Sequence, residues 1–538
     1  MQFKRILATI LTALIVIGGT AQAATYDNIP EQIVCTPYGD LKTQVGFSWI
    51  TSKNNSASMV DIVERKGPVP NFDGAIRFTT NDGAATEGNR EDDTWRWHKI
   101  VATGLKPGTT YQYRVGDGTY WSDAGQFSTS PETMPEEGFT FLQVNDPQAS
   151  IENNFYVWGY AMEQARETFL DYKFILLGGD HVDVASNADQ WEMFFDKAQT
   201  VIGKSVFAGA VGNHDVRQSS YNTDESLLPY RFNYLMQPDA IFEYGPYYSF
   251  DYGNAHFMIL NSDALLVSDN EVQQNWIKYD FVKNAKKWNI VMLHRSLYTN
   301  GPQYKDTEAR KILSELLYDV LGVDIVFGGH DHVYNRTYPI LNNAPVTDSA
   351  VLKNQTVGKL TDVTLWDNPI GTVNQLNNAV GTKFYTLKSN DLKWFVPLDV
   401  AKGSTLYQPH LATYAGVTVT ENEIVNSAYY TDGAESTLIE RQGIRKTMPK
   451  INPPKNVVRT YDEATNSVTL TWNAPDAQND QTAKRYVVYD ENNAYEKDWT
   501  TFTTDKTITI SLGDTKYADT NFVVKSIGIH SVSDAGTN

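Results

Sequence analysis

The sequence predicts an α/β domain flanked by two all-β sandwich domains. Residues 29–131 contain short, alternating, aromatic-rich segments separated by turn residues, a pattern typical of a β-sandwich. From residue 139, apolar strands alternate with segments of helical spacing, which indicates an α/β domain. From residue 455, the short alternating segments return. We therefore expect a signal segment at residues 1–23, sandwich domains at 24–132 and 450–538, and the α/β domain at 138–447.

The first 23 residues have the composition of a secretory signal peptide. Lys4 and Arg5 precede an apolar run at residues 6–17, and Ala21-Gln22-Ala23 is a small-residue cleavage site. The rest of the sequence contains no second stretch of about 18 apolar residues, so we expect no membrane span. The mature protein is therefore expected to be secreted or periplasmic.

The net charge argues against one class of partner, and the cysteine content excludes intrachain disulfides. The formal net charge is -19, and loss of residues 1–23 removes two positive and no negative charges, which argues against a nucleic-acid partner. Cys35 is the only cysteine, so no intrachain disulfide can form. Stability must come from buried cores, which a chain of this length can supply by dividing into several domains.

Two aromatic residues of the N-terminal domain are expected to be structural. Residues 105–111 resemble the tyrosine corner of fibronectin type III domains, with Tyr111 at the corner and Trp49 in the core. As an alternative, Trp95, Trp97 and Trp121 could form a sugar-stacking face.

Five times in the α/β domain, an apolar strand ends in a polar cluster that can hold a metal ion. The strands cover residues 139–144, 173–177, 205–211, 288–293 and 323–327, and helices are expected at 156–171, 187–200 and 307–321. The clusters are Asn145-Asp146-Pro147-Gln148, Gly178-Gly179-Asp180-His181-Val182-Asp183, Gly212-Asn213-His214-Asp215, His294, and Gly328-Gly329-His330-Asp331-His332. Since ligands in open α/β sheets gather beyond the carboxyl ends of strands, we expect all five clusters at one rim.

The last cluster carries the strongest single signal. Two glycines allow a sharp turn after the strand, and alternation places His330 and His332 on the same side. Taken alone, this segment could also be a strand end with two surface histidines. However, five of the nine histidines lie in the clusters: His181, His214, His294, His330 and His332. Carboxylate, amide and imidazole donors suit Zn, Mn or Fe, and the absence of cysteine ligands argues against a thiolate zinc site.

This ordered set of motifs resembles the calcineurin-like metallophosphoesterases. Together with the fibronectin-like N-terminal domain, it is most similar to bacterial relatives of the purple acid phosphatases. The resemblance implies a four-layer αββα domain and two metal ions. One ion would be held by Asp146, Gln148, Asp180 and His332, and the other by Asp180, Asn213, His294 and His330.

The sequence departs from the family pattern at three places. Asp183 stands where purple acid phosphatases have the tyrosine that binds iron and gives the colour, so no tyrosinate-coloured centre is expected. Gln148 replaces a histidine found in many metallophosphoesterases. Residues 295–298, after His294, contain no second histidine, so the extra histidine pair of plant and mammalian enzymes is missing from this stretch.

The expected chemistry is hydrolysis of phosphate monoesters by in-line attack of a metal-bound hydroxide. His214 is the expected proton donor, and Asp215 is expected to orient it. Arg295 and Arg336 are candidate phosphate contacts, or else surface salt-bridge partners. His181 is expected to support the site from behind the ligands, or alternatively to touch substrate.

Beyond residue 336 the family resemblance weakens. Residues 339–366 are expected to form a loop along the active-site cleft. Strands are expected at 383–387, 415–420, 423–429 and 436–441, which would complete a second sheet. A linker at 448–454 then leads to a second fibronectin type III-like domain.

Two other functional hypotheses remain open at this level. One is a phosphodiesterase or nucleotidase, and the other is a secreted adhesion or carbohydrate-binding protein with an inactive central domain. The expected partner is therefore a phosphorylated small molecule or nucleotide, with possible cell-surface or polysaccharide contact through the sandwich domains. The completeness of the ligand set favours the enzyme.

Overall fold

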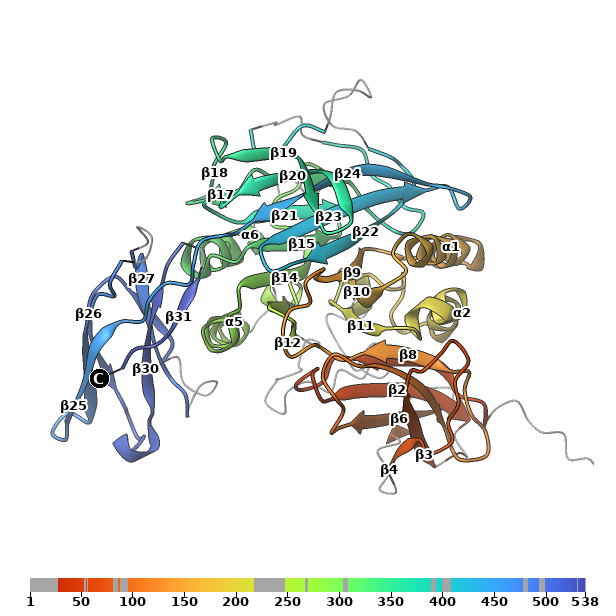
Figure 1. Cartoon of the computed structure of the whole chain (residues 1–538), viewed down its shortest axis with the longest axis horizontal. Coiled ribbons are helices and arrows are strands. Elements are labelled where there is room, and N and C mark those ends of the chain that lie inside the picture. Colours follow the sequence, from red (N-terminus) through yellow and green to blue (C-terminus); the bar gives the residue numbers. More distant parts are fainter. Residues whose placement is uncertain are drawn as a thin grey trace, which may run out of the picture.

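The structure is a computed structural model. It describes residues 28–537 except 53–54, 56, 81–85, 88–94, 217–246, 267–269, 303–307, 389–392, 399–407, 478–481, 493–498 and 530, so the predicted signal peptide lies outside the described residues. A central α/β unit lies between a sandwich of N-terminal strands (red to orange) and a sandwich of C-terminal strands (blue) (Figure 1). None of the helices in the described part is long and apolar enough to cross a membrane.

The larger sheet joins strands from distant parts of the sequence. At its centre, β9 (Phe139–Val144), β10 (Tyr172–Leu177) and β11 (Val206–Gly209) run parallel. Beyond β9 come β22 (Ala412–Val419), β23 (Glu423–Thr431), β24 (Ser436–Arg445), β20 (Leu360–Asp367) and β19 (Val351–Val357). Beyond β11 come β1 (Glu31–Thr36), β2 (Val45–Ser52), β6 (Trp95–Ala102) and β5 (Thr86–Glu87).

The smaller sheet supplies the other two predicted site strands. Its order is β12 (Tyr248–Tyr252), β13 (Ala255–Ile259), β14 (Trp288–Arg295), β15 (Ile325–Gly329), β21 (Val373–Asn377) and β16 (Tyr334–Arg336). Strands β13, β14, β15 and β21 are parallel, so the carboxyl ends of β14 and β15 lie at the same edge.

Strand alternation builds four layers, αββα. Phe141 and Phe174 point between the sheets, where both rings pack on Phe257 with centroids 5.4 and 5.2 Å away. Leu142 and Val144 point outward and pack with α1 (Glu152–Thr168) and α2 (Ala188–Ile202). The outer face of the smaller sheet is covered by α5 (Asn270–Asn284), α6 (Glu308–Ser314) and the π-helix Glu315–Leu321. Each central strand therefore has both faces buried, which explains its nearly continuous apolar sequence.

The N-terminal sandwich is continuous with the central unit. Strand β1 pairs with β2 on one side and with β11 on the other, where Cys35 lies opposite Val206. The facing sheet has the order β4 (Ile76–Thr80), β3 (Ser58–Glu64), β7 (Thr110–Gly116) and β8 (Gly125–Ser128). The backbone N–H of Lys106 donates to the Tyr111 hydroxyl at 2.8 Å, and Trp49 is buried, as predicted.

The alternative sugar-stacking face is not formed by the tryptophans that the structure describes. Trp97 is buried. The ring of Trp121 is covered by the guanidinium of Arg114 at 4.1 Å. The side chain of Trp95 lies outside the described residues.

Three predictions beyond residue 336 were wrong. The expected loop at 339–366 contains β17 (Ile340–Leu341), β18 (Ala344–Pro345), β19 and most of β20. Residues 383–387 form no strand, because their backbone bonds to the site loops rather than to a strand, as the Tyr385 N–H does to the His332 carbonyl at 3.0 Å. The strands β22 to β24 extend the first sheet through β9 instead of completing the second.

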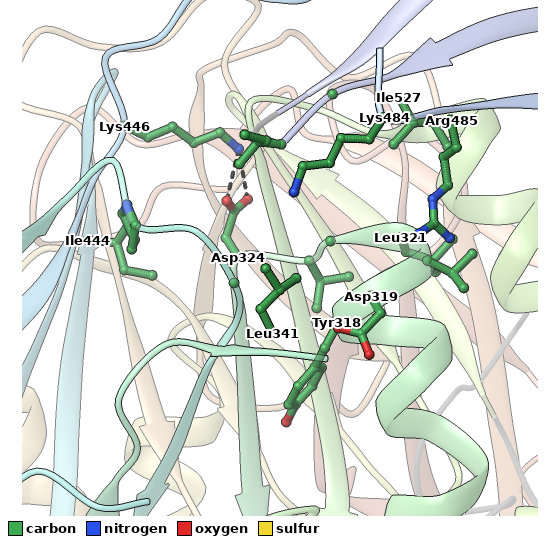
Figure 2. Close-up of a pocket in the computed structure, with 17 residues that line it drawn as sticks. Tyr318, Asp319, Leu321, Asp324, Leu341, Ile444, Lys446, Lys484, Arg485 and Ile527 are labelled. Carbon is green, nitrogen blue, oxygen red and sulfur yellow. Dashed lines mark hydrogen bonds and ion pairs between the residues drawn. The ribbon is translucent and has the colours of Figure 1, made fainter. Parts of the chain in front are cut away.

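The C-terminal strands form a second sandwich that packs on the central unit. One sheet contains β25 (Lys455–Asp462), β26 (Ser467–Asn473) and β29 (Thr507–Ser511), and the other β28 (Thr501–Thr503), β27 (Arg485–Asp490), β30 (Phe522–Ile527) and β31 (Val532–Ala535). Tyr489 packs edge-on against Tyr279 of α5 with centroids 5.9 Å apart. Figure 2 shows the pocket at this seam, where Arg485 lies next to Leu321 of the π-helix and Lys446 pairs with Asp324 at 2.9 Å.

In the described residues, the remaining short helices are α3 (Asn213–Val216) and two 3-10 turns, Ala264–Leu266 and Tyr517–Asp519.

Candidate metal centre

The structure brings the five polar clusters together at one rim. Asp180 Oδ2 lies 3.3 Å from His294 Nε2, and Asn213 Oδ1 and His330 Nδ1 lie 3.1 and 3.2 Å from the same nitrogen. Donor atoms of Asp180, His294 and His330 all fall within 4.8 Å of one another. Four potential ligands from four different strand ends therefore face one point.

Asp146 and His332 lie on the adjoining side of the cluster. Asp146 Oδ1 is 3.6 Å from His332 Nε2, and both carboxylate oxygens accept the His330 backbone N–H, at 3.0 and 3.1 Å. The first and last clusters are thereby joined across 184 residues of sequence.

Three residues at the rim have positive φ angles, which residues other than glycine seldom adopt. Asp146, Asp180 and His330 have φ values of 51°, 52° and 69°, in the left-handed region. A Cβ on Gly329 would lie 2.8 Å from the Gly178 carbonyl oxygen and 3.0 Å from Asp146 Oδ2. Glycine at this position therefore permits the close approach of the strand ends.

Carbonyl groups fix the orientation of two imidazoles. His294 donates its Nδ1–H to the Gly178 carbonyl at 2.8 Å, and His332 donates its Nδ1–H to the Lys383 carbonyl. Both rings therefore present Nε2 to the cluster, which is the arrangement that a histidine metal ligand requires.

The ionisation of these groups is strongly coupled. Burial raises the pKa of Asp180, but the neighbouring His294, His214 and His330 outweigh it and hold the pKa below its ordinary value. Burial lowers the pKa of His294, but Asp180, Asp146 and Asp263 outweigh it and raise the pKa to about 10. The pKa of His330 is lowered by burial, by His294 and by Arg295. The carboxylates that surround His294 therefore favour a positive charge at this point, as they would favour a metal cation.

Gln148 lies at the edge of the cluster, with its amide held on both sides. Its Nε2 donates to Asp183 Oδ1 at 3.0 Å, and its Oε1 accepts from Lys383 Nζ at 3.4 Å. Asp183, which stands at the family's tyrosine position, therefore contacts Gln148.

His214 projects from the start of α3 with one nitrogen fixed. Its Nδ1–H donates to the Asp183 carbonyl at 2.8 Å, and the Asp183 carboxylate lies 3.4 Å from the same nitrogen. The side chain keeps 23% of its surface exposed, and its backbone N–H donates to Asp180 Oδ1 at 2.8 Å. Nε2 is therefore the ring atom able to exchange a proton with a substrate.

The prediction that Asp215 orients His214 was wrong. Asp215 is buried and accepts the backbone N–H groups of Asp180, His181 and Gly212, together with His181 Nδ1–H at 3.0 Å. It ties two site loops together, while Asp183 holds His214. His181 is fully buried behind the loops and packs near Trp191, so its side chain is not exposed at the rim.

Neither predicted arginine is available for phosphate. Arg336 is buried and forms a two-pronged ion pair with Glu440, with both contacts at 2.9 Å. Arg295 pairs with Asp263 at 2.9 Å and donates to His330 Nε2 at 3.2 Å. Arg295 therefore orients His330 from behind, and Arg336 fixes β16 to β24.

The residues present fit metal ions. Buried carboxylate, amide and imidazole groups converge on one point, and a borderline divalent or trivalent cation suits such a donor set. The sequence reasoning missed Lys383, because it assigned residues 383–387 to a strand. The glycine at 381 was the available signal for a close approach.

Comparison with known proteins agrees with this geometry. Residues 139–334 match the model described as calcineurin-like phosphoesterase, and residues 30–129 match the N-terminal domain of purple acid phosphatase. Purple acid phosphatase 21 of Arabidopsis thaliana is 29% identical over 251 residues, 46% of this chain and 54% of that protein. Purple acid phosphatase 22 of the same plant is 28% identical over 253 residues, 46% of this chain and 55% of that one. The chain thus spans about half the length of the curated relatives it matches.

A solved structure supports the same fold. The purple acid phosphatase from yellow lupin (Lupinus luteus) seeds superposes with a TM-score of 0.59 and 15% identity, covering 78% of this chain and 75% of that one. The fold and the strand-end site agree with these matches, and residues 139–334 are a calcineurin-like phosphoesterase domain. The chain is similar to the purple acid phosphatases in both its N-terminal and its central domain.

Proposed function

We propose that this chain is an exported, metal-dependent phosphoesterase that hydrolyses phosphate monoesters. The convergence of carboxylate, amide and imidazole donors around Asp180 carries the proposal. The match of residues 139–334 to the calcineurin-like phosphoesterase model supports the reaction class, and the relatives named as phosphatases support the monoester.

Two metal ions fit the donors present. Asp146, Gln148, Asp180 and His332 would hold one, and Asp180, Asn213, His294 and His330 the other, with iron, zinc or manganese as the candidate metals. When bound, the ions would activate a water molecule for in-line attack and neutralise charge on the phosphoryl group.

The protein residues contribute proton transfer and orientation. His214 Nε2 gives a proton to the leaving oxygen, while the Asp183 carbonyl holds the ring through Nδ1–H. Asp215 keeps the loops that carry Asp180 and Asn213 in register.

Metal analysis and a substrate panel test this proposal. Metal-reconstituted protein should bind two ions and cleave simple, non-nucleotide phosphate monoesters faster than phosphodiesters or nucleotides. Asp180→Asn should lose metal and activity, whereas Asp171→Asn, at a carboxylate that is 93% exposed, should lose neither. Protein that holds at most one ion at saturating metal, or that cleaves no phosphate ester, would contradict the proposal.

Export and domain boundaries are part of the same proposal. Signal cleavage would leave Ala24 as the first residue, and the sandwich and catalytic domains would meet near residues 132–138 and 447–450. Amino-terminal sequencing of the exported protein tests the first point, and limited proteolysis tests the second.

A further inference from the structure

Residues 379–385 form a segment that crosses the rim of the metal centre. The Val380 N–H donates to the Asn145 carbonyl at 2.8 Å, and the Tyr385 N–H donates to the His332 carbonyl at 3.0 Å. The Tyr385 ring stacks on His332, with centroids 4.6 Å apart and planes 24° apart. These contacts tie the segment to both the first and the last ligand cluster.

At Gly381 the backbone of this segment packs closely against the backbone of the first ligand cluster. A Cβ at that position would lie 2.5 Å from the Pro147 carbonyl oxygen and 2.9 Å from the Asp146 carbonyl oxygen. Because His332 also donates to the Lys383 carbonyl, the backbone of Lys383 is fixed relative to Asp146 and His332. A long side chain at residue 383 therefore starts from a defined place beside the metal ligands.

The Lys383 ammonium reaches over the edge of the centre. Its Nζ lies 3.4 Å from Gln148 Oε1 and 5.7 Å from the centre of the Tyr385 ring. Lys383 is exposed, and no carboxylate in the described part of the chain forms an ion pair with it. A cation next to a metal centre is repelled by it unless an anion lies between the two.

Other cations near the site are already engaged. Arg336 is paired with Glu440, and Arg295 with Asp263 and His330. Neither guanidinium can turn toward substrate without breaking a buried ion pair, which is costly.

From this geometry, we propose that Lys383 binds the phosphoryl group of the substrate and favours the doubly charged monoester over the singly charged diester. The inference rests on the proposed function, because it places a phosphate at the metal centre. An ammonium acts as a point charge, so its attraction grows with the charge of the phosphate.

The test measures phosphate binding apart from turnover. Inorganic phosphate is titrated by calorimetry into the metal-loaded full chain, comparing wild type with Lys383→Met, Lys383→Arg and Lys388→Met. Lys388 is an exposed lysine just beyond this segment and serves as the matched control. We expect Lys383→Met to weaken phosphate binding about tenfold, Lys383→Arg to restore most of it, and Lys388→Met to change little.

Turnover then tests the preference for monoesters. In Lys383→Met, kcat/KM for a nitrophenyl monoester should fall several times more than that for the corresponding diester, with metal content unchanged. Equal phosphate affinity in wild type and Lys383→Met, or an equal loss for both esters, would overturn the inference. If wild type binds phosphate through Lys383 but cleaves no ester, the proposed function fails while this binding role stands.

Discussion

Replacing His214 separates proton delivery from metal binding. In His214→Ala the backbone N–H that donates to Asp180 Oδ1 remains, as do Asn213 and its contact with His294. The change removes an imidazole whose fixed Nδ1–H leaves Nε2 as the atom offered to substrate. We therefore expect both metals to stay bound.

The expected rate loss follows from the role of the His214 imidazole as a general acid. General acid catalysis contributes about 10² to 10⁴ in rate when the leaving group needs a proton. An alkyl phosphate, which leaves as an alkoxide, should show this full loss in His214→Ala. A nitrophenyl phosphate leaves as a stable phenolate, and its rate should fall much less.

The assay compares kcat for the two substrates at saturating metal, with metal content measured in each sample. His410→Asn, at an exposed histidine, is a control that should lose nothing. Asp183→Asn should cause a smaller loss than His214→Ala, because the backbone carbonyl of residue 183 still holds the ring. An equal loss for both leaving groups would show that His214 acts electrostatically or structurally and not as the acid.

Three further predictions concern colour, stability and the C-terminal sandwich. An iron-loaded sample should lack an intense tyrosinate band, because Asp183 stands at the tyrosine position; a visible band abolished only by a tyrosine substitution would refute this. His256 lies buried between Asp251 and Asp280, and although burial lowers its pKa, the two carboxylates raise it to about 9. Its contribution to the free energy of unfolding, about 3 kcal/mol, is therefore complete below its unfolded pKa of about 6.5 and is lost as pH rises through 9. Denaturant titrations of wild type and His256→Gln should diverge at pH 6 and converge at pH 10, and a constant difference would contradict the assignment. Truncation after Lys450 should lower the melting temperature, since Tyr489 and its neighbours share a core with α5 and the π-helix. The folded fraction should still hydrolyse a small soluble phosphate ester, and a folded truncation without turnover would show that the last sandwich shapes the site.

The fold class and the residues that meet at the candidate metal centre were predictable from the sequence. Apolar strands that end in Asp146, Asp180, Asn213, His294 and His330 could be read directly, because strand periodicity and strand-end clusters are local properties. The same local logic identified the Trp49 core position and the Tyr111 corner. The start of α2 was readable from Asn187, whose side chain accepts the Asp189 and Gln190 N–H groups.

The partner of each polar side chain depends on long-range packing and was not predictable from the sequence. Asp215 is adjacent to His214 in sequence but forms a hydrogen bond with His181. Arg336 forms its ion pair with Glu440, which lies 104 residues away. The pairing of β1 with β11, which makes the N-terminal sandwich part of the catalytic sheet, joins residues about 170 positions apart. Lys383 lies beside the candidate metal centre because neighbouring backbone groups form hydrogen bonds with Asn145 and His332. These long-range hydrogen bonds cannot be predicted from the periodicity of the sequence. Local patterns fix what each segment can form, whereas long-range pairing depends on the packing of the whole chain.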